Sequence, residues 1–301
     1  MSIVVVGSLN MDLVARVHEH PRPGETLLGS EYQTHPGGKG ANQAVAAARM
    51  GGRVRMIGRV GRDGFGGALL RGLEAEHVDA REVLEVGAPT GVAFIAINHR
   101  GENTIIVSLG ANARLCPEDL TSLQFANAKV VLLQLEVPLE TVEKAAQLGK
   151  EAGAVVVLNA APARELPKRL LSKLGVLVVN ESETFALTGR LPDSPDSALG
   201  AAKELSSVVP SVVVTLGSQG ACWAEGASSG HQPGFPVQVV DTTAAGDAFV
   251  GALAVALSEG LDLAGAVRLG AAAGALAVTK AGAQPSLPTR KEAEALLRQA
   301  S

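Results

Sequence analysis

Short apolar runs of strand length recur along the chain, and helical patterns separate them. The runs are rich in β-branched residues and comprise Ile3–Val6, Val130–Leu135, Val155–Leu158, Val176–Val179 and Val212–Leu216. Between two of them, the segment Leu139–Ala152 repeats small apolar residues on one face of a helix. Alternation of this kind is typical of βαβ units around a mostly parallel sheet. The sequence therefore predicts an α/β fold.

The composition fits a globular protein that binds small molecules. Of 301 residues, 47% are hydrophobic and 19% charged, which suffices for one large domain or two small ones. Lys and Arg number 26 and Asp and Glu 30, so the net charge is −4 without any block of like charge. Apolar stretches are interrupted well before the length that spans a bilayer. We expect neither a nucleic acid nor a membrane as partner.

The ends and the cysteines give two further expectations. The chain opens directly on Ile3–Val6 without a basic segment or a small-residue cleavage site, so we expect no signal peptide and a cytoplasmic protein. Cys116 and Cys222 are far apart and form no C-x-x-C pair, so both are expected to be ordinary buried thiols.

Two segments interrupt the α/β rhythm. Val14–Leu28 carries prolines and a glycine between extended pieces, and Gly91–Val107 has the pattern of a hairpin with its turn at residues 98–103. The hairpin is apolar on both faces, which a flap with one wet face would not need. We expect a lid that closes over a ligand and pairs with a second subunit. The alternative is an ordinary hairpin of the main sheet.

Polar residues stand at the carboxyl ends of the predicted strands. They are Asn10, Asp12, Glu136, Asn180 and Thr215. Each alone is more often a turn former or a helix cap. Ligands of open parallel sheets bind outside these strand ends, so five polar residues at one edge favour a shared cleft.

A glycine-rich segment follows the first polar pair. Asn10 and Asp12 are two residues apart and so point the same way in an extended segment, where an amide and a carboxylate suit paired hydroxyls. Gly38 begins a helix start at which Lys39 and Asn42, three apart, project from one side. Taken alone, this segment is more often a turn with a solvated lysine. Together with the first pair, it indicates a polyol site.

The segment Asp241–Asp247 precedes an apolar helix and carries the chemistry. Its small residues allow a ligand close to the backbone, and the free N–H groups of the first helical turn attract an anion. The chain lacks a Walker loop, a G-x-G-x-x-G motif, an H-E-x-x-H motif and a G-x-S-x-G elbow. Asp247 beside a phosphate-binding turn therefore indicates phosphoryl transfer to a hydroxyl.

The chain resembles the phosphofructokinase-B family of carbohydrate kinases. Two motifs carry the resemblance, Gly37–Gln43 and Asp241–Asp247. Supporting segments are Gly7–Asp12, Asn180–Glu183, Thr215–Gly220 and Ala281–Ser286, so the likeness covers nearly the whole chain. The variant Thr-Ala-Ala-Gly-Asp and the ending Ala-Gln-Pro-Ser look most like members that phosphorylate D-ribose at O5 with ATP.

The resemblance implies an architecture and a set of roles. The fold would be a three-layer α/β/α sandwich with a mostly parallel sheet, one domain over residues 1–301, with a small β-sheet lid from about 10–34 and 88–108. Asp247 would be the general base, kept ionised by the helix N-terminus. The N–H groups of Ala244, Ala245, Gly246 and Asp247 would form the anion hole. The sugar would be held by Asn10, Asp12, Gly38, Lys39, Asn42, Glu136 and Asp247.

The resemblance also implies cofactors and partners. The nucleotide side would comprise Asn180, Glu183, Thr215, Gly217, Gly220 and Gly246, with Mg²⁺ held mainly by phosphates and water. A K⁺ activator would lie at Asp241, Thr243, Ala277, Lys280, Gly282 and Ser286, mostly on backbone carbonyls. Gly270 stands where we align a residue that flanks the base, so a side-chain contact would be missing there. The expected assembly is a homodimer joined through the lids.

Alternatives remain within and outside this class. The chain is alternatively a kinase of another sugar or nucleoside, such as deoxyribose, fructose or adenosine. More remotely, it is a sugar-binding regulator without turnover. The intact Asp247 and its turn argue against the latter.

Overall fold

A nine-stranded sheet forms the centre of the computed structural model, which describes residues 2–300. Its order is β13 (Ser228–Gln232), β12 (Ala221–Glu225), β11 (Ser211–Thr215), β10 (Val176–Val179), β9 (Val155–Asn159), β8 (Ala128–Leu133), β1 (Ser2–Val6), β4 (Arg53–Gly61) and β5 (Asp79–Val86). Strands β12 and β13 are antiparallel to their neighbours, and the other pairs are parallel. The predicted α/β class is confirmed.

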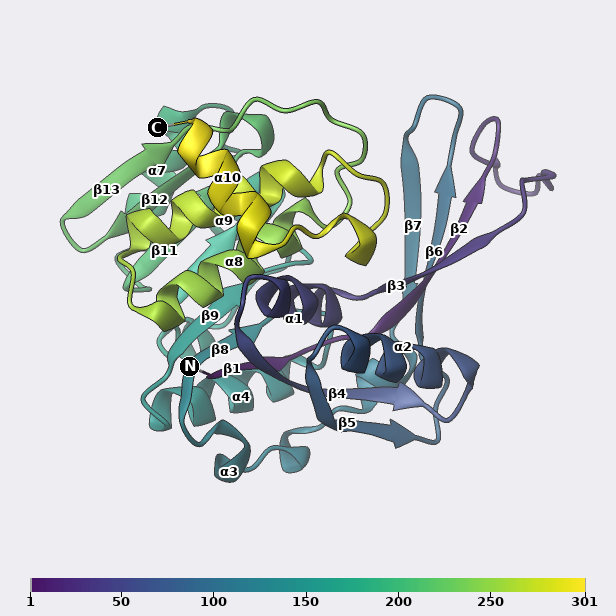
Figure 1. The fold of residues 1–301 in the computed structure, drawn as a ribbon, viewed down its shortest axis with the longest axis horizontal. Coiled ribbons are helices and arrows are strands. Elements are labelled where there is room, and N and C mark those ends of the chain that lie inside the picture. Colours follow the sequence, from purple (N-terminus) through teal and green to yellow (C-terminus); the bar gives the residue numbers. More distant parts are fainter. Residues whose placement is uncertain (1, 301) are drawn as a thin grey trace.

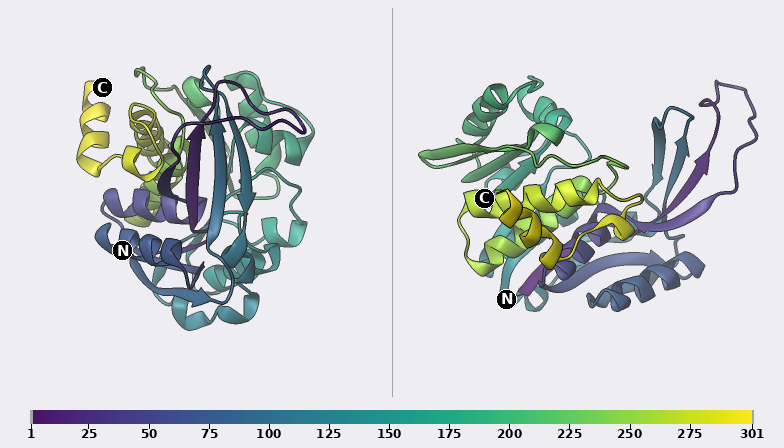
Figure 2. Two further views of the ribbon diagram at one scale, coloured as in Figure 1. Left: turned by 90° about the vertical axis from the view of Figure 1, so that its right-hand side faces the viewer. Right: turned by 45° about the horizontal axis from the view of Figure 1, so that its top comes forward.

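Helices cover both faces of this sheet (Figures 1 and 2). One face carries α1 (Lys39–Arg49), α2 (Gly64–Ala75), α8 (Ala245–Glu259), α9 (Leu263–Ala277) and α10 (Arg290–Gln299). The other carries α3 (Ser122–Phe125), α4 (Leu139–Glu151), α5 (Lys168–Leu171), α6 (Glu181–Thr188) and α7 (Pro195–Leu205). Four 3₁₀ turns complete the list of described helices: η1 (Gly110–Arg114), η2 (Pro117–Asp119), η3 (Gly217–Gln219) and η4 (Gln284–Ser286). The three-layer sandwich is thus confirmed.

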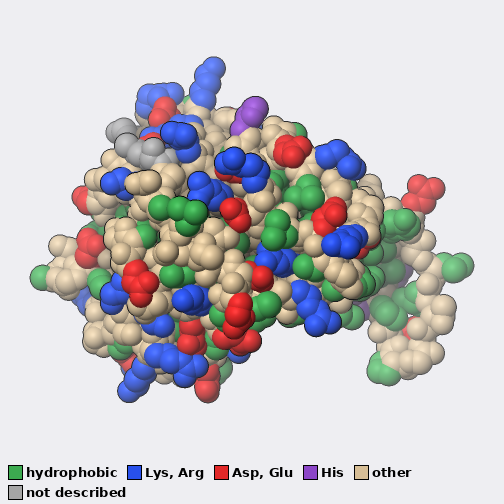
Figure 3. Space-filling view, turned by 90° about the horizontal axis from the view of Figure 1, so that it is seen from below, with side chains coloured by type: hydrophobic (Ala, Val, Ile, Leu, Met, Phe, Trp, Pro, Cys, Tyr) green, Lys and Arg blue, Asp and Glu red, His purple; other side chains and the backbone are tan. Residues whose placement is uncertain are grey.

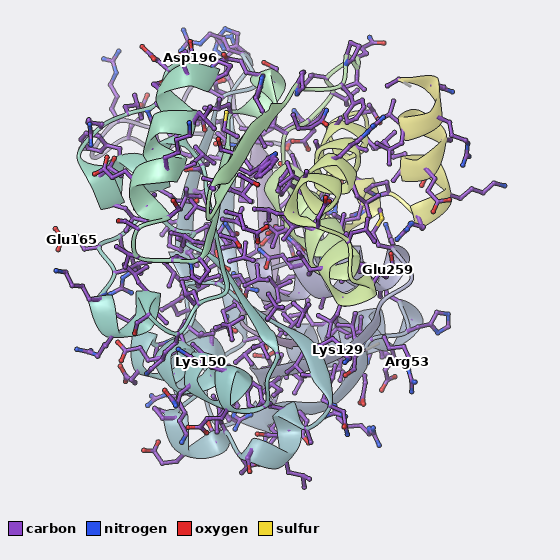
Figure 4. All side chains as sticks on the ribbon, turned by 90° about the vertical axis from the view of Figure 1, so that its left-hand side faces the viewer. Arg53, Lys129, Lys150, Glu165, Asp196 and Glu259 are labelled. Atoms are coloured by element: carbon purple, nitrogen blue, oxygen red, sulfur yellow. The ribbon has the colours of Figure 1, made fainter. Side chains whose placement is uncertain are left out.

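The two apolar layers explain why the central strands carry uninterrupted apolar runs. In β8, Val130 and Leu132 belong to one buried cluster, whereas Val131 and Leu133 belong to the other. Successive side chains of a strand point to opposite faces, so a strand segment covered on both sides is apolar at consecutive positions. The charged side chains of Glu165 and Asp196 are exposed, as is that of Lys129 near the start of β8 (Figure 4).

A separate four-stranded sheet projects from one side of the core (Figures 1 and 2). This small sheet has the order β3 (Gln33–Gly37), β2 (Asn10–Arg16), β6 (Gly91–Ile97) and β7 (Asn103–Ser108). Strands β2 and β6 are parallel, and the outer pairs are antiparallel. The predicted hairpin therefore lies outside the main sheet, and the alternative that placed it within that sheet is wrong.

The surface of the α/β core and the surface of the small sheet differ in polarity. Side chains of Lys, Arg, Asp and Glu are interspersed over the core, whereas hydrophobic side chains gather on the projecting small sheet (Figure 3). The exposed apolar residues there include Phe94 and Ile106 of the sheet and Leu28 and Tyr32 of the loop between β2 and β3. No helix within residues 2–300 combines the length and the apolar character needed to cross a bilayer.

Two local expectations need correction. The second apolar run begins two residues early, at Ala128, and its strand ends at Leu133, because the backbone of Leu135 turns to donate to the carbonyl of Ala161 at 2.9 Å. Cys222 is buried as expected, but Cys116 is exposed. Cys116 precedes η2, a surface turn that apolar periodicity does not reveal.

A close crossing of α1 and α8 sets the position of the site. A Cβ at Gly251 would stand 2.5 Å from the Cβ of Ala46 and 2.9 Å from the nitrogen of Ala47. Only glycine lets the two backbones approach so closely. Gly251 lies one turn after Asp247, so this contact brings the first turn of α8 against the residues that open α1.

Candidate active site

A cavity of about 290 Å³ lies between the carboxyl edge of the central sheet and the small sheet. Every residue expected to hold the sugar lines it: Asn10, Asp12, Gly38, Lys39, Asn42, Glu136 and Asp247. The small sheet adds Ala93, Ile95, Asn103, Ile105 and Val107, and the turn before α8 adds Thr242, Thr243 and Ala244. A polar floor under a largely apolar wall suits a small polyol.

Asp247 is held between two amide donors at the start of α8. The carboxylate is 7% exposed, and Asn42 Nδ2 donates to its Oδ2 at 3.0 Å while Gln43 Nε2 donates to its Oδ1 at 2.9 Å. Burial raises the pKa of Asp247, against the opposing effects of Lys39 and of the two amides. The helix N-terminus was expected to favour the ionised form of Asp247. The effect of burial on the pKa is larger, because little water reaches the carboxylate. A carboxylate with a raised pKa is a stronger base.

The turn before α8 is built for close approach. Ala244 has φ 60°, in the left-handed region that costs non-glycine residues of order 1 kcal/mol and that clusters at functional sites. Asp241 Oδ1 fixes the turn by accepting from the N–H and the hydroxyl of Thr243 at 2.9 and 2.7 Å. No heavy atom lies within 4 Å of a Cβ placed at Gly246. The molecule is therefore open beside Gly246, which leaves room for a ligand at the first turn of α8.

A lysine and four carboxylates share the cavity and its surroundings. Burial alone would lower the pKa of Lys39. The nearby carboxylates of Asp247, Glu136, Glu183 and Asp12 have the opposite and larger combined effect, so the pKa is raised overall and Lys39 stays charged. Burial, with Glu136 and Asp247, raises the pKa of Asp12 to about 7. Lys39 is therefore not the solvated lysine of an ordinary turn.

Glu136 ties the floor of the cavity together. Its Oε2 accepts from Ser8 Oγ at 2.6 Å and from the backbone N–H of Lys39 at 3.0 Å. This carboxylate therefore links the end of β1 to the beginning of α1. Its other oxygen is left for a ligand hydroxyl.

Asn112 was missed by sequence reasoning. It is fully buried in η1, and its Nδ2 donates to Asn10 Oδ1 at 2.7 Å and to the Leu9 carbonyl at 3.0 Å. Its Oδ1 accepts from the Leu9 N–H at 2.9 Å. Asn10 must consequently turn its NH₂ group toward the cavity. A side chain at Gly91 would collide with both amides, so the glycine makes room for them.

Gln43 and Gln134 are also missed positions, both fully buried behind Asp247. Gln43 lies within a recognised motif, yet only its neighbour Asn42 was assigned a role. A polar residue inside an apolar helix face was the available signal. Gln134 lies directly after β8, at the same sheet edge as the other polar residues.

The residues expected at the nucleotide side form a second group outside this cavity's lining. Asn180 and Glu183 make a capping box for α6, in which Asn180 Oδ1 accepts from the Glu183 N–H and Glu183 Oε2 from the Asn180 N–H, both at 2.9 Å. Burial raises the pKa of Glu183. Thr215 ends β11, and Gly217 follows in η3 with open space beside it. Gly220, with φ 94°, ends that turn against β13.

Gly270, which we aligned with a base-flanking residue, lies within α9. It is buried in α9, and a Cβ there would lie 2.9 Å from the Phe249 carbonyl oxygen. The position therefore faces α8 and not a ligand. The missing side chain therefore leaves room for Phe249 in the packing of α9 against α8.

Of the residues expected to hold a monovalent cation, Thr243 and Gly282 contact Asp241 directly. Its Oδ2 accepts from the Gly282 N–H at 2.9 Å, and its own N–H donates to the Val278 carbonyl at 3.2 Å. Burial alone would raise the pKa of Asp241, but the hydrogen bonds from Gly282 and Thr243 lower it overall. Ala277 and buried Ser286 flank this loop, whereas the Lys280 ammonium turns away to Glu292 at 3.0 Å. Carboxylate and carbonyl oxygens suit a hard cation.

Two histidines and a glutamate lie close together at the exposed end of the small sheet. His18, Glu19 and His99 have potential ligand atoms within 4.8 Å of one another. The two rings are stacked, with centroids 4.7 Å apart and planes inclined by 14°. His99 Nδ1 lies 2.7 Å from the His18 carbonyl oxygen and 3.4 Å from Glu19 Oε1, so contacts within the group already engage this nitrogen.

A larger hollow, of about 680 Å³, lies at the opposite, amino-terminal edge of the sheet. Its arginines Arg55 and Arg81 are both paired with Asp79. Parallel sheets bind ligands at the carboxyl edge, so the smaller cavity is the candidate active site. A three-layer α/β fold with a buried carboxylate at a helix N-terminus over a polyol-sized cavity defines a sugar kinase.

Known proteins agree with this class. The family described as pfkB family carbohydrate kinase matches residues 1–290. The ribokinase of Haemophilus influenzae is 42% identical over 97% of this chain and 96% of its own, and the deoxyribokinase of Salmonella typhi is 38% identical over 96% of each. The structure of Arabidopsis thaliana ribokinase, complexed with ribose and ATP, has a TM-score of 0.91 at 36% identity and covers 98% of both chains. The chain belongs to the pfkB family of carbohydrate kinases.

Proposed function

We propose that the protein transfers the γ-phosphoryl group of ATP to O5 of D-ribose, giving D-ribose 5-phosphate and ADP. The observation that carries this proposal is the buried Asp247 at the start of α8, facing a cavity lined by Asn10, Asp12, Lys39 and Glu136. The similarity to ribokinases over nearly the full chain supports ribose as the sugar.

In the proposed reaction, Asp247 accepts the proton of the sugar hydroxyl as its oxygen bonds to the γ-phosphorus. The bond from that phosphorus to the bridging oxygen breaks, and ADP leaves. The N–H groups of Ala244, Ala245, Gly246 and Asp247 stabilise the charge on the transferring group. Asn10, Asp12, Gly38, Lys39, Asn42 and Glu136 hold the other hydroxyls.

The nucleotide and the cations complete this proposal. Gly217 and Gly246 both border open space, which lets phosphates approach the backbone near Asn180, Glu183, Thr215 and Gly220. Mg²⁺ enters with ATP and is held mainly by phosphates and water. K⁺ binds at the loop around Asp241 and raises turnover. Because this chemistry uses cytosolic ATP and both cysteines are free, we place the protein in the cytoplasm.

We also propose one domain over residues 1–301, whose small sheet is a lid and the contact of a homodimer. On β6 and β7, Ala93, Ile95, Ile105 and Val107 face the cavity. Phe94 and Ile106 pair across the strands on the other face and are 50% and 66% exposed. An apolar outer face of this kind is covered when two lids pack together.

The first test is ADP release from Mg·ATP with ribose, deoxyribose, fructose and adenosine, each with K⁺ and with Na⁺. We expect ribose to be preferred and K⁺ to raise turnover. Phosphorus NMR of the product places the phosphoryl group. Preference for deoxyribose, which the 38% identity to a deoxyribokinase makes the second candidate, would change the substrate and keep the mechanism. A folded protein that turns over none of these sugars would be a binding protein.

Asp247→Asn tests the base. We expect turnover to fall by about 10³-fold or more, while ribose binding changes little, because the amide keeps the shape but accepts no proton. The matched control is Asp262→Asn, an exposed residue that caps the neighbouring helix α9 and that asparagine replaces well. Turnover near that of the unchanged protein in Asp247→Asn would contradict the proposal.

A further inference from the structure

Behind Asp247 lies a chain of two buried glutamine amides. Gln43 Nε2 donates to Asp247 Oδ1 at 2.9 Å and to Asn159 Oδ1 at 3.0 Å. Gln43 Oε1 accepts from Gln134 Nε2 at 2.7 Å. Both glutamines are fully buried, so water does not replace any of these partners.

Donor and acceptor chemistry permits only one orientation of the Gln43 amide. Both hydrogens of its NH₂ group are used, on two oxygens that cannot donate. If its oxygen and nitrogen exchanged places, the oxygen would face Asp247 and Asn159, and two NH₂ groups would face each other at Gln134. The donor from Gln134 is what distinguishes the two orientations at the far end of the amide.

Gln134 is held in place at a cost to the protein. Its Oε1 is buried and has no hydrogen-bond partner among residues 2–300. This oxygen occupies the space that a side chain at position 7 would need, so Gly7 leaves room for it. An unpaired buried carbonyl is unfavourable. The unpaired Oε1 of Gln134 is thus accompanied by a useful contact, because Nε2 of the same amide donates to Gln43.

We propose that Gln43 is a positioning residue for Asp247 and that Gln134 sets the orientation of the Gln43 amide. This inference rests on the proposed role of Asp247 as the base. With Asn42 on Oδ2 and Gln43 on Oδ1, each carboxylate oxygen receives one donor, and the plane of the carboxylate is fixed. A free lone pair then remains on an oxygen of known direction for the hydroxyl proton.

The charged groups that influence Asp247 come from three other elements and from the loop after β8. Lys39 of α1 favours its ionised form, whereas Glu136 after β8, Asp12 of β2 and Glu183 of α6 disfavour it. Gln43 and Gln134 are uncharged. They can therefore orient the Asp247 carboxylate without changing the charge around it. Replacing either glutamine by glutamate changes both the orientation of that carboxylate and the surrounding charge.

The decisive variant is Gln134→Glu, which does not touch Asp247. Its carboxylate cannot donate to Gln43 Oε1 but accepts from Nε2, so Gln43 turns over and presents oxygen to Asp247. We expect kcat to fall by about tenfold to a hundredfold, the KM for ribose to change by less than about threefold, and the acid limb of the kcat profile to move to higher pH.

A double-mutant cycle separates this route from a direct effect of the new charge. In Gln43→Met, no amide remains to be turned, so Gln134→Glu should lower kcat by less than about twofold further. An equal loss from Gln134→Glu in both backgrounds would overturn the proposal, as would a pH profile that does not move. Turnover that survives Asp247→Asn would instead refute the proposed base.

A second variant covers poor folding of the first. Gln134→Met is similar in length and uncharged, and it leaves Gln43 without an orienting donor. We expect a fall in kcat of about threefold that disappears in the Gln43→Met background. Thermal melting checks that each variant is folded. No fall in kcat in folded Gln134→Met would overturn the role of Gln134.

Discussion

Single side chains in this site are oriented by partners that never reach the ligand. Asn112 holds the oxygen of Asn10 at 2.7 Å, and the glutamine pair holds Asp247 in the same manner. In each case a fully buried amide determines whether the inner residue shows a donor or an acceptor to the cavity. Recognition at this site therefore depends on residues one step behind its surface.

Asn112→Asp tests this reasoning on the sugar side. The carboxylate cannot donate to Asn10 Oδ1, so the Asn10 amide turns and shows oxygen to the cavity. We expect the KM for the sugar to rise by about tenfold or more, with little change in the KM for ATP. The control is Asn127→Asp, an exposed position at the far edge of the sheet. Equal changes in the two KM values would indicate general loss of structure instead.

Asp12 makes stability depend on pH in an unusual direction. Burial, Glu136 and Asp247 raise its pKa to about 7, so the folded protein holds a proton that the unfolded chain releases near pH 4. This contribution to stability is complete below pH 4 and is lost as pH rises to 7. From pH 5 to pH 8, the protein should lose about 2–3 kcal/mol relative to Asp12→Asn.

Urea denaturation of both proteins at the two pH values measures this difference. Glu165→Gln, an exposed position, serves as the control and should show no such dependence. A constant difference between the unchanged protein and Asp12→Asn across this range would mean that Asp12 is ionised throughout.

Sequence reasoning identified the inner residues but not their supports. Lys39, Asn42 and Asp247 stand at helix starts beside glycines, a local signal that one segment reveals. The bond from Gln43 to Asp247 spans 204 residues and that from Gln134 to Gln43 spans 91. No local pattern encodes such pairs, because the fold alone brings them together.

At the scale of elements, the crossing of α1 and α8 sets the precision of the site. Gly251→Ala places a methyl group 2.5 Å from the Ala46 Cβ, so the helices must move apart. We expect a loss of about 1–3 kcal/mol in stability and a fall in kcat, since Gln43 and Asn42 are drawn away from Asp247.

Thermal melting and steady-state kinetics measure both effects of this substitution. The control is Gly72→Ala in α2, where nothing lies within 4 Å of the new Cβ. There alanine should preserve or raise stability, because it favours the helix. A Gly251→Ala protein as stable and active as the parent would show that the crossing tolerates a wider spacing.

The existence of five strands of the main sheet (β1, β8, β9, β10 and β11) and of α4 followed from apolar periodicity, and their ends moved by at most two residues. The lid strand β3 was not anticipated, since its residues Gln33–Gly37 are polar or small and resemble a turn. Its ladder with β2 supplies the pairing that local propensity lacks. The order of the nine strands is likewise a property of tertiary packing.

For the whole molecule, the proposed assembly depends on the outer face of the small sheet. Ile106→Asp places a charge at a position that is 66% exposed in one chain and covered in the proposed dimer. We expect the molecular mass from light scattering to halve. Leu123→Asp is the control, since Leu123 is 80% exposed in α3, away from that sheet. A dimer that survives Ile106→Asp would place the contact elsewhere.

The small sheet is made by two excursions of the chain, one between β1 and α1 and the other between β5 and η1. Neither excursion contains the turn before α8. The small sheet, which forms one wall of the cavity, can therefore be exchanged or redesigned separately from the residues around Asp247. A protein engineer who wants a new acceptor would graft residues 91–108 from a relative and leave the phosphoryl-transfer machinery alone.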